Sequence, residues 1–275
     1  MDRPWTRRRL LHSVAGGLAG SGVVSAQRDS PAGDISVQGR RATFSADYGR
    51  LLESVAYTFI HRYGWRVTFE EALNVYSGDF VDVTLTRPKR PITDGRRLYA
   101  LRGGHLEFSY DLGPDGRPPE NPAAVLQTAL DAYHRGGFPG RYELRTAGEY
   151  FHIVPTARRD EDGEGEPFQS PLDTIVTLDG RGRSPDEIMR ELAQLMKRNV
   201  VGYRLWTFGG PLIHRGNAVP PPRIVERFER VKAREVLRSL IAATGKSLIW
   251  YLMCGMRQDK FGTKRYGCYL SLRGL

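Results

Sequence analysis

The chain contains a recurring unit in which an amphipathic helix, a glycine and a strand follow one another. In the clearest copy, residues 231–244 carry apolar side chains at helical spacing, Gly245 follows, and residues 247–254 and 266–272 have the composition of strands. Such a helix buries its apolar face against a sheet, so the unit predicts an α+β fold of small mixed sheets with helices on one face. The helical stripe comprises Ala233, Val236, Leu237, Leu240, Ile241 and Thr244.

A looser copy begins at Asn121, where an N-cap residue precedes Pro122 at the first helical position. Its helix is followed by a predicted hairpin of residues 142–145 and 149–154 around Ala147 and Gly148.

Two further helices are predicted from their boundary residues. Ser45 is the candidate cap of a helix that follows a strand-like run at 35–44 and ends at Gly64. Ser184 and Glu187 match a capping box at the start of the other.

The order of elements divides the chain into two similar halves, each reading strand, helix, strand, then helix and two strands. The first half spans 34–156 and the second 171–275, with an acidic polar linker at 157–170. An extra hairpin of residues 98–101 and 105–110 is predicted inside the first half. The alternative is one continuous sheet whose halves resemble each other by coincidence.

The N-terminal 26 residues have the pattern of a cleaved export signal. A basic start precedes a glycine-rich, weakly apolar stretch, and the small residues that end at Ala26 fit a cleavage site. The stretch is too short and too polar for a good membrane span. The mature chain would begin at Gln27, without a transmembrane anchor, and would be periplasmic or secreted.

The run from Thr6 to His12 resembles the twin-arginine export signal. Arg7, Arg8, Leu10 and Leu11 carry the match, while His12 stands where that signal has lysine. The resemblance implies export of the protein in its folded state. The alternative is a general secretory signal with a chance cluster of arginines.

Removal of the signal changes the charge argument. The 275 residues carry a formal charge of +10, and four arginines and one aspartate lie in the signal, so the mature chain carries +7. Export also separates the protein from cytosolic nucleic acid, which the sequence therefore excludes as a partner. Basic residues are densest in the loop that contains Arg87, Lys89, Arg90, Arg96 and Arg97. We interpret this loop as a solvated connection. The alternative is that it contacts an anionic envelope polymer or lipid headgroups.

The segment 231–273 resembles the short N-terminal domain of secretins and TonB-dependent receptors. Leu237, Leu240, Ile241, Thr244 and Gly245 carry the match. The order of elements is also similar to an uncharacterised family of bacterial twin-arginine-exported proteins. Both resemblances imply an envelope location and a docking role, and neither implies a reaction.

No catalytic, cofactor or metal motif stands out in the sequence. There is no nucleophile elbow, phosphate loop or dinucleotide fingerprint. No two of the six histidines lie within five residues. Asp160, Asp162 and Glu164 match the first positions of a calcium loop, but Pro171 stands where its bidentate carboxylate belongs, so a solvated loop is favoured.

Cys254 and Cys268 are candidates for a disulfide. If the last two strands pair antiparallel with Trp250 opposite Leu272, the two cysteines lie opposite each other on one face. Export would permit the bond, and the alternative is two buried thiols.

These observations favour an exported, non-catalytic binding or assembly module of the cell envelope, with an envelope protein or anionic envelope polymer as its partner. The alternative is an enzyme or ligand-capture protein with a site between the two halves. Its candidate residues would be Asp173, Glu149, His152 and His214. We expect no cofactor, and the sequence does not indicate an oligomeric state.

Overall fold

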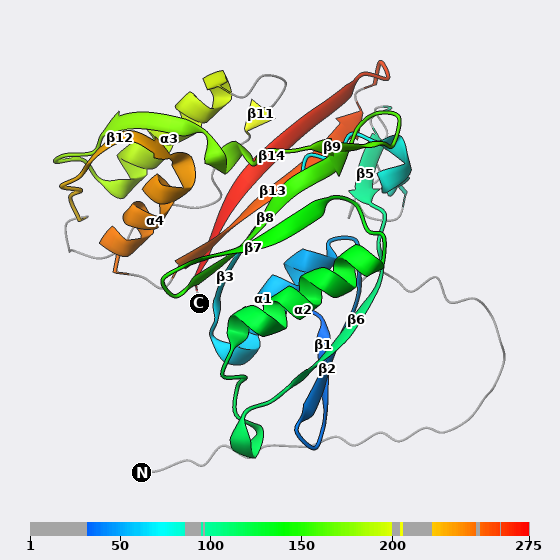
Figure 1. The fold of residues 1–275 in the computed structure, drawn as a ribbon. Helices are drawn as coiled ribbons and strands as arrows, with labels where there is room; N and C mark the ends of the chain where they lie inside the picture. The colour runs from blue at the N-terminus through cyan, green and yellow to red at the C-terminus, as the bar shows by residue number, and fades with distance from the viewer. Residues whose placement is uncertain are drawn as a thin grey trace, which may run out of the picture.

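Figure 1 shows a computed structural model in which helices pack against three β-sheets. It describes residues 32–85, 95, 97–199, 204–205, 222–245, 248–258 and 260–274. The α+β fold class is confirmed. The export signal and its cleavage site at Ala26 lie outside the described residues. So do His214 and most of the basic segment around Lys89.

The smaller sheet of the first half contains β1 (Asp34–Gln38), β2 (Arg41–Tyr48) and β6 (Gly104–Asp111), all antiparallel. Ala42, Phe44 and Ala46 alternate into the core, so the chain remains a strand beyond the predicted end at residue 44. Ser45 therefore pairs with strand residues on both sides and does not cap a helix, contrary to prediction.

Helix α1 (Leu51–Tyr63) begins after Arg50 and ends at Gly64, as predicted, with a left-handed φ of 69°. Helix α2 (Pro122–Arg135) has the predicted cap, because Asn121 Oδ1 accepts a hydrogen bond of 3.1 Å from the amide of Ala124. The two helices pack side by side, with α1 contacting β2 and β3 (Arg66–Glu70) and α2 contacting β6 and β7 (Arg141–Ala147). The main hydrophobic core lies around them.

The predicted hairpin of residues 98–101 and 105–110 does not form. Strand β5 (Arg97–Leu101) pairs with β4 (Phe80–Asp82) and with β13 (Leu248–Gln258), whereas β6 pairs with β2. Leu106, Phe108 and Tyr110 alternate into the core around α1, which draws β6 into the other sheet.

In the second half, β10 (Ile175–Asp179) and β12 (Arg227–Lys232) form a two-stranded antiparallel sheet. Helices α3 (Pro185–Asn199) and α4 (Ala233–Ala243) pack beside it. The predicted capping box is present at α3, since the Glu187 carboxylate accepts a 2.7 Å hydrogen bond from the amide of Ser184. Figure 1 shows these elements grouped beside one end of the central sheet.

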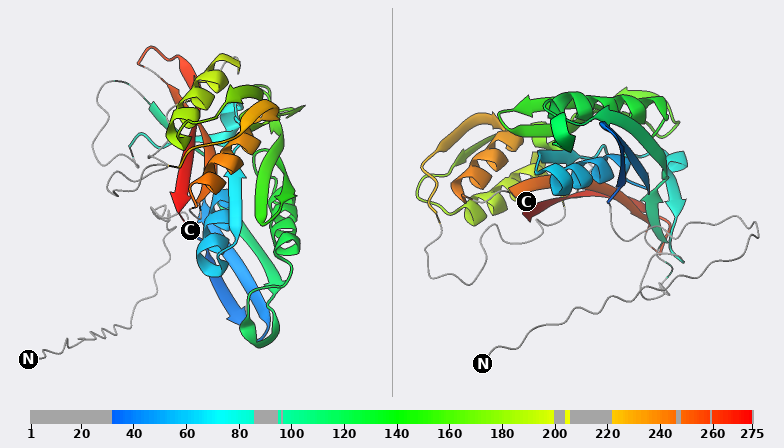
Figure 2. Two further views of the ribbon diagram at one scale, coloured as in Figure 1. Left: turned by 90° about the vertical axis from the view of Figure 1, so that its left-hand side faces the viewer. Right: turned by 90° about the horizontal axis from the view of Figure 1, so that it is seen from below.

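The central sheet combines strands of both halves. Its main path runs β11 (Arg204–Leu205), β14 (Lys264–Gly274), β13, β3, β8 (Tyr150–Arg159) and β7, and β13 meets β3 in parallel. The two predicted halves therefore do not have separate sheets, and their division into two domains is not confirmed. The views in Figure 2 show this sheet running across the molecule between the helices of the two halves.

The segment 157–170, predicted as a solvated linker, instead includes a hairpin. Strand β8 continues to Arg159 and pairs with β9 (Gly165–Pro167). An ion pair of 2.6 Å joins Arg158 and Glu166, and Phe168 is buried. The sequence does not reveal this hairpin, because Arg158 and Glu166, which join its two strands, are charged like the residues of the turn between them.

The strand pairings of the first half recur in the second. The pairs β2–β6 and β10–β12 are antiparallel, β3–β8 and β11–β14 are parallel, and β7–β8 and β13–β14 are antiparallel. Helices occupy the same places in the order, since α1 and α3 precede the parallel pairs and α2 and α4 precede the hairpins. Across the described residues, no helix combines the length and apolar composition that a membrane crossing requires.

Candidate anion-binding site

A buried ionic network links the two halves. The guanidinium of Arg234, on α4, binds both carboxylate oxygens of Glu70 at the end of β3, at 2.7 and 2.6 Å. Its third nitrogen binds Asp173 at 2.7 Å. Ser170 and Trp250 also donate hydrogen bonds to Glu70. The network fixes the first turn of α4 against the central sheet, because a buried charge needs these partners.

Asp173 lies among three cationic side chains. Besides Arg234, it accepts contacts from Lys232 at 3.0 Å and from Arg145 at 3.1 Å. Burial alone would raise the pKa of Asp173, but hydrogen bonds and charge from Arg234 and its other cations lower it to about 2. The Asp173 carboxylate is therefore ionised at neutral pH, and it holds the three cationic side chains in place.

His152 lies beside this network within the sheet. Its Nδ1 shares a hydrogen bond of 2.7 Å with Thr68, and its ring stacks on Trp250 with 5.1 Å between ring centres. Burial and the charges of Arg234, Arg238 and Arg145 lower the pKa of His152 to about 3. The imidazole is therefore neutral and buried, as is typical of a structural histidine.

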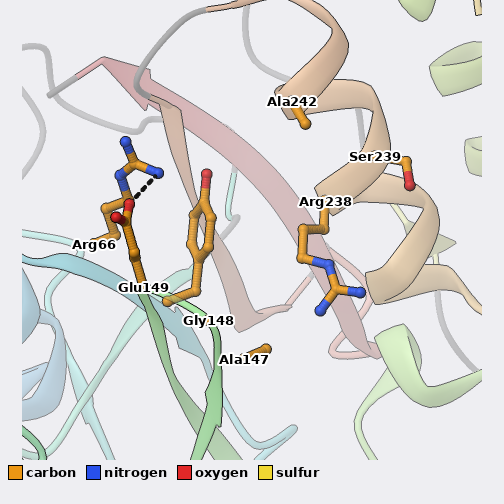
Figure 3. Close-up of a pocket in the computed structure, with 8 residues that line it drawn as sticks. Arg66, Ala147, Gly148, Glu149, Arg238, Ser239 and Ala242 are labelled. Carbon is orange, nitrogen blue, oxygen red and sulfur yellow. Dashed lines mark ion pairs between the residues drawn. The ribbon is translucent and has the colours of Figure 1, made fainter.

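A hollow of about 370 Å³ opens where the β7–β8 turn approaches α4 (Figure 3). The turn has Gly148 at its first central position with a φ of 61°, which suits a two-residue hairpin turn. Small side chains on both walls leave the space unfilled. The lining residues are Arg66, Ala147, Gly148, Glu149, Tyr150, Arg238, Ser239 and Ala242.

The hollow is asymmetric in charge. On the sheet side, Arg66 pairs with Glu149 at 2.9 Å, and its guanidinium lies 5.5 Å from the centre of the Tyr150 ring. On the helix side, Arg238 points toward the sheet, and no ion pair with it occurs among the described residues (Figure 3). Because Arg238 lies one turn beyond Arg234, it adds its charge to the cations of the buried network.

This arrangement suits an anionic ligand. Arg66, Arg238 and Ser239 line the hollow, and the Tyr150 ring offers a flat surface for stacking. The Glu149 carboxylate, 78% exposed, occupies only one of the guanidinium groups. Within the described ranges, no group of three or more His, Cys, Asp or Glu side chains is placed to hold a metal ion.

Sequence reasoning identified part of this region and missed the rest. Of the residues named for a site between the halves, Glu149 lines the hollow, while Asp173 and His152 lie in the buried layer beside it. Arg66 and Arg238 were missed, since each is one arginine among many on the surface. Only Arg238 has a sequence signal, which is its spacing of four residues from Arg234 on an amphipathic helix.

Cys254 and Cys268 lie opposite each other in the register of β13 and β14, with Trp250 opposite Leu272, as the sequence pattern indicated. A disulfide joins them, with 3.9 Å between the two Cα atoms.

The backbone of Cys254 also meets the first half. Its amide donates to Glu71 at 2.7 Å, and its carbonyl accepts from Arg50 at 3.0 Å. Arg50 and Glu71 are themselves paired at 2.9 Å. The disulfide therefore lies where β13 adjoins the chain segment that follows β3.

The acidic loop is a turn closed by its own backbone. Asp160 Oδ1 accepts hydrogen bonds from the amides of Asp162 and Glu164, at 3.0 and 2.9 Å. This oxygen is thus engaged within the turn that joins β8 and β9. The geometry favours the solvated turn over the calcium loop.

Comparison of the chain with protein-family models, curated proteins and solved structures finds no match.

Proposed function

We propose that this chain is an exported, non-catalytic binding module of the bacterial cell envelope that holds a phosphate-bearing envelope polymer in the hollow between β7–β8 and α4. The observation that carries the proposal is that Arg238, which has no ion pair among the described residues, lines the hollow together with Arg66 and Tyr150. A guanidinium group binds phosphate oxygens in bidentate fashion, so two of them in the lining of one hollow suit a ligand with more than one phosphate.

The shape of the hollow favours a polymer over an enclosed small molecule. Both Glu149 and Arg238 are exposed, so a chain can enter and leave along the surface. The net positive charge of the mature sequence adds a general attraction for a polyanion. Ala147, Gly148 and Ala242 leave room for the backbone of such a polymer.

Short-chain inorganic polyphosphate is the probe for this function, titrated calorimetrically into the mature protein at low salt. Arg238→Gln should weaken binding about tenfold, because it removes one charge-assisted contact and leaves a polar, uncharged side chain. The affinity should also fall as salt increases.

Arg135→Gln is the matched control, since Arg135 is an exposed helical arginine in the last turn of α2, away from the hollow. It removes the same charge and should change the affinity less than twofold. Equal losses in both variants, or no binding by the unmodified protein, would reject the hollow as the site.

The location in the envelope belongs to the same proposal. Its support is the resemblance of residues 6–12 to a twin-arginine signal, and the cross-strand disulfide fits an oxidising compartment. A folded reporter fused to residues 1–31 should be exported, and replacement of both Arg7 and Arg8 by lysine should stop that export. Continued export of the double variant would contradict the twin-arginine route.

We further propose that the two halves are related to each other, and that the second half contains, at residues 231–273, a module of the secretin and TonB short N-terminal-domain type. The recurrence of the pairings β3–β8 and β11–β14 in the same chain order supports this relation. A modular origin also explains why the hollow lies where α4 of one half meets the β7–β8 hairpin of the other.

A further inference from the structure

The turn between β13 and β14 presents an aromatic side chain among lysines. Phe261 is 82% exposed, and the Lys260 ammonium lies 5.0 Å from the centre of its ring. Lys264, also exposed, begins β14 directly after the turn. Figure 1 shows this hairpin, drawn in red, extending beyond the neighbouring strands at one end of the molecule.

A second exposed apolar side chain lies at the same end. Leu85 is 95% exposed and follows β4, where Val83 bonds to the backbone of Leu98 in β5. Strand β5 in turn pairs with the end of β13, with Arg97 opposite Gln258. A Cβ atom placed on Gly95 would lie 3.6 Å from the Cβ of Lys260. The two strand ends are therefore neighbours.

The most exposed apolar side chains are concentrated at this end of the molecule. Within the described ranges, the large apolar side chains exposed by more than four fifths are Leu85, Val225 and Phe261, and two of the three lie here. Exposed apolar groups surrounded by lysine fit the boundary of an anionic membrane, where rings and aliphatic chains enter the acyl region and ammonium groups meet lipid phosphates. A polyanion in water offers no place for the apolar groups.

We propose that this end of the molecule, formed by Leu85, Phe261, Lys260 and Lys264, docks onto an anionic phospholipid surface. Phe261 and Leu85 enter the interface, and the two lysines pair with headgroup phosphates. The contact is peripheral and reversible, since two apolar side chains and a few charges give modest affinity.

The docked orientation has a consequence for the hollow. Strand β13 runs parallel to β3 and β8, so its first residues lie at the end of the sheet where Arg66 and Tyr150 line the hollow. Its last residues lead to the membrane-docking end. Eleven residues of strand span about 35 Å, so the docked protein would hold the hollow about that far from the lipid surface.

Cosedimentation with vesicles tests the docking. The mature protein should bind phosphatidylcholine vesicles that contain phosphatidylglycerol and should bind pure phosphatidylcholine weakly. Phe261→Ser should lower the partition coefficient about tenfold. Lys260→Gln and Lys264→Gln should each lower it about fivefold.

Val225→Ser is the apolar control, because Val225 is 83% exposed and lies outside this end, just before β12. Arg40→Gln, in the β1–β2 turn, is the charge control. Both should keep the partition of the unmodified protein. Failure to bind anionic vesicles, or equal losses in the control variants, would overturn the docking proposal. The polyphosphate titration would be unaffected, because its site lies at the other end of the sheet.

Discussion

At the scale of the residue, Arg234 is a buried cation whose stability depends on its ion-pair partners. It is 7% exposed on a helix whose other buried residues are apolar, and it satisfies Glu70 and Asp173 at once. A cation in such a place stabilises the fold only while all of its partners are present.

Arg234→Met should therefore destabilise the protein by about 3–5 kcal/mol, because it leaves Glu70 buried without its bidentate partner. Urea unfolding followed by circular dichroism measures this loss. Arg238→Met, one turn further along α4 and exposed, is the matched control and should cost less than about 0.5 kcal/mol. Similar losses in the two variants would show that the network adds nothing.

His152 should impose a pH dependence on stability. Because the pKa of His152 is lowered from 6.5 to about 3 in the folded protein, the unfolded chain takes up a proton first as the pH falls. The free energy of unfolding should thus decrease by about 2 kcal/mol between about pH 7 and pH 5 through this residue.

The variant His152→Gln should lack that part of the pH dependence, as measured by urea unfolding at the two pH values. His105→Gln is the control, since Asp47 raises the pKa of His105 and the residue is exposed. If His152→Gln and the unmodified protein lose stability in parallel, His152 is not held neutral by the fold.

Individual residues also show how far sequence reasoning reaches. Asn121, Gly64 and the Ser184–Glu187 pair were predicted correctly, because each acts through the backbone beside it. Ser45 was predicted wrongly, since it sits in a strand stabilised by partners distant in the chain. Arg234 was not identified, because nothing local marks a charged residue as buried.

At the scale of the element, the β13–β14 hairpin combines local and distant constraints. Its register follows from the alternation of Trp250, Leu252 and Cys254, which is readable in the sequence. Its pairing with β3 and β5 is not, because those contacts depend on edges that only the folded sheet provides.

Reduction of the Cys254–Cys268 bond should lower the free energy of unfolding by about 3 kcal/mol, as expected for a loop of this size. Mass spectrometry after alkylation should find two added groups only when the unfolded protein is first reduced. The Cys254→Ala, Cys268→Ala double variant is the control, and its stability should not respond to reductant. An unmodified protein that is alkylated without reduction would indicate two thiols.

At the scale of the whole molecule, the central sheet couples the two halves. Strand β13 adjoins β3, and the Glu70–Arg234–Asp173 network joins the same two parts. The sequence predicted the order of elements within each half, but the junction between halves depends on long-range packing that periodicity does not report.

This coupling predicts one unfolding transition for the protein. Differential scanning calorimetry should give a single peak with equal calorimetric and van't Hoff enthalpies. Arg234→Met should lower the temperature of that peak without splitting it. Two separate peaks in the unmodified protein would show instead that the halves unfold independently.

The position of β13 also determines when the protein is able to fold. The amide of Cys254 bonds to Glu71, which follows β3, across 183 residues of chain, and β3 lacks its neighbour β13 until that strand has been synthesised. The central sheet is therefore complete only after β13 has been made, and until then the edge of β3 that β13 covers lacks its partner. Export of the folded protein, as in the proposed twin-arginine route, would carry β3 and β13 across already paired, whereas a chain exported unfolded would have to form this long-range pairing after crossing.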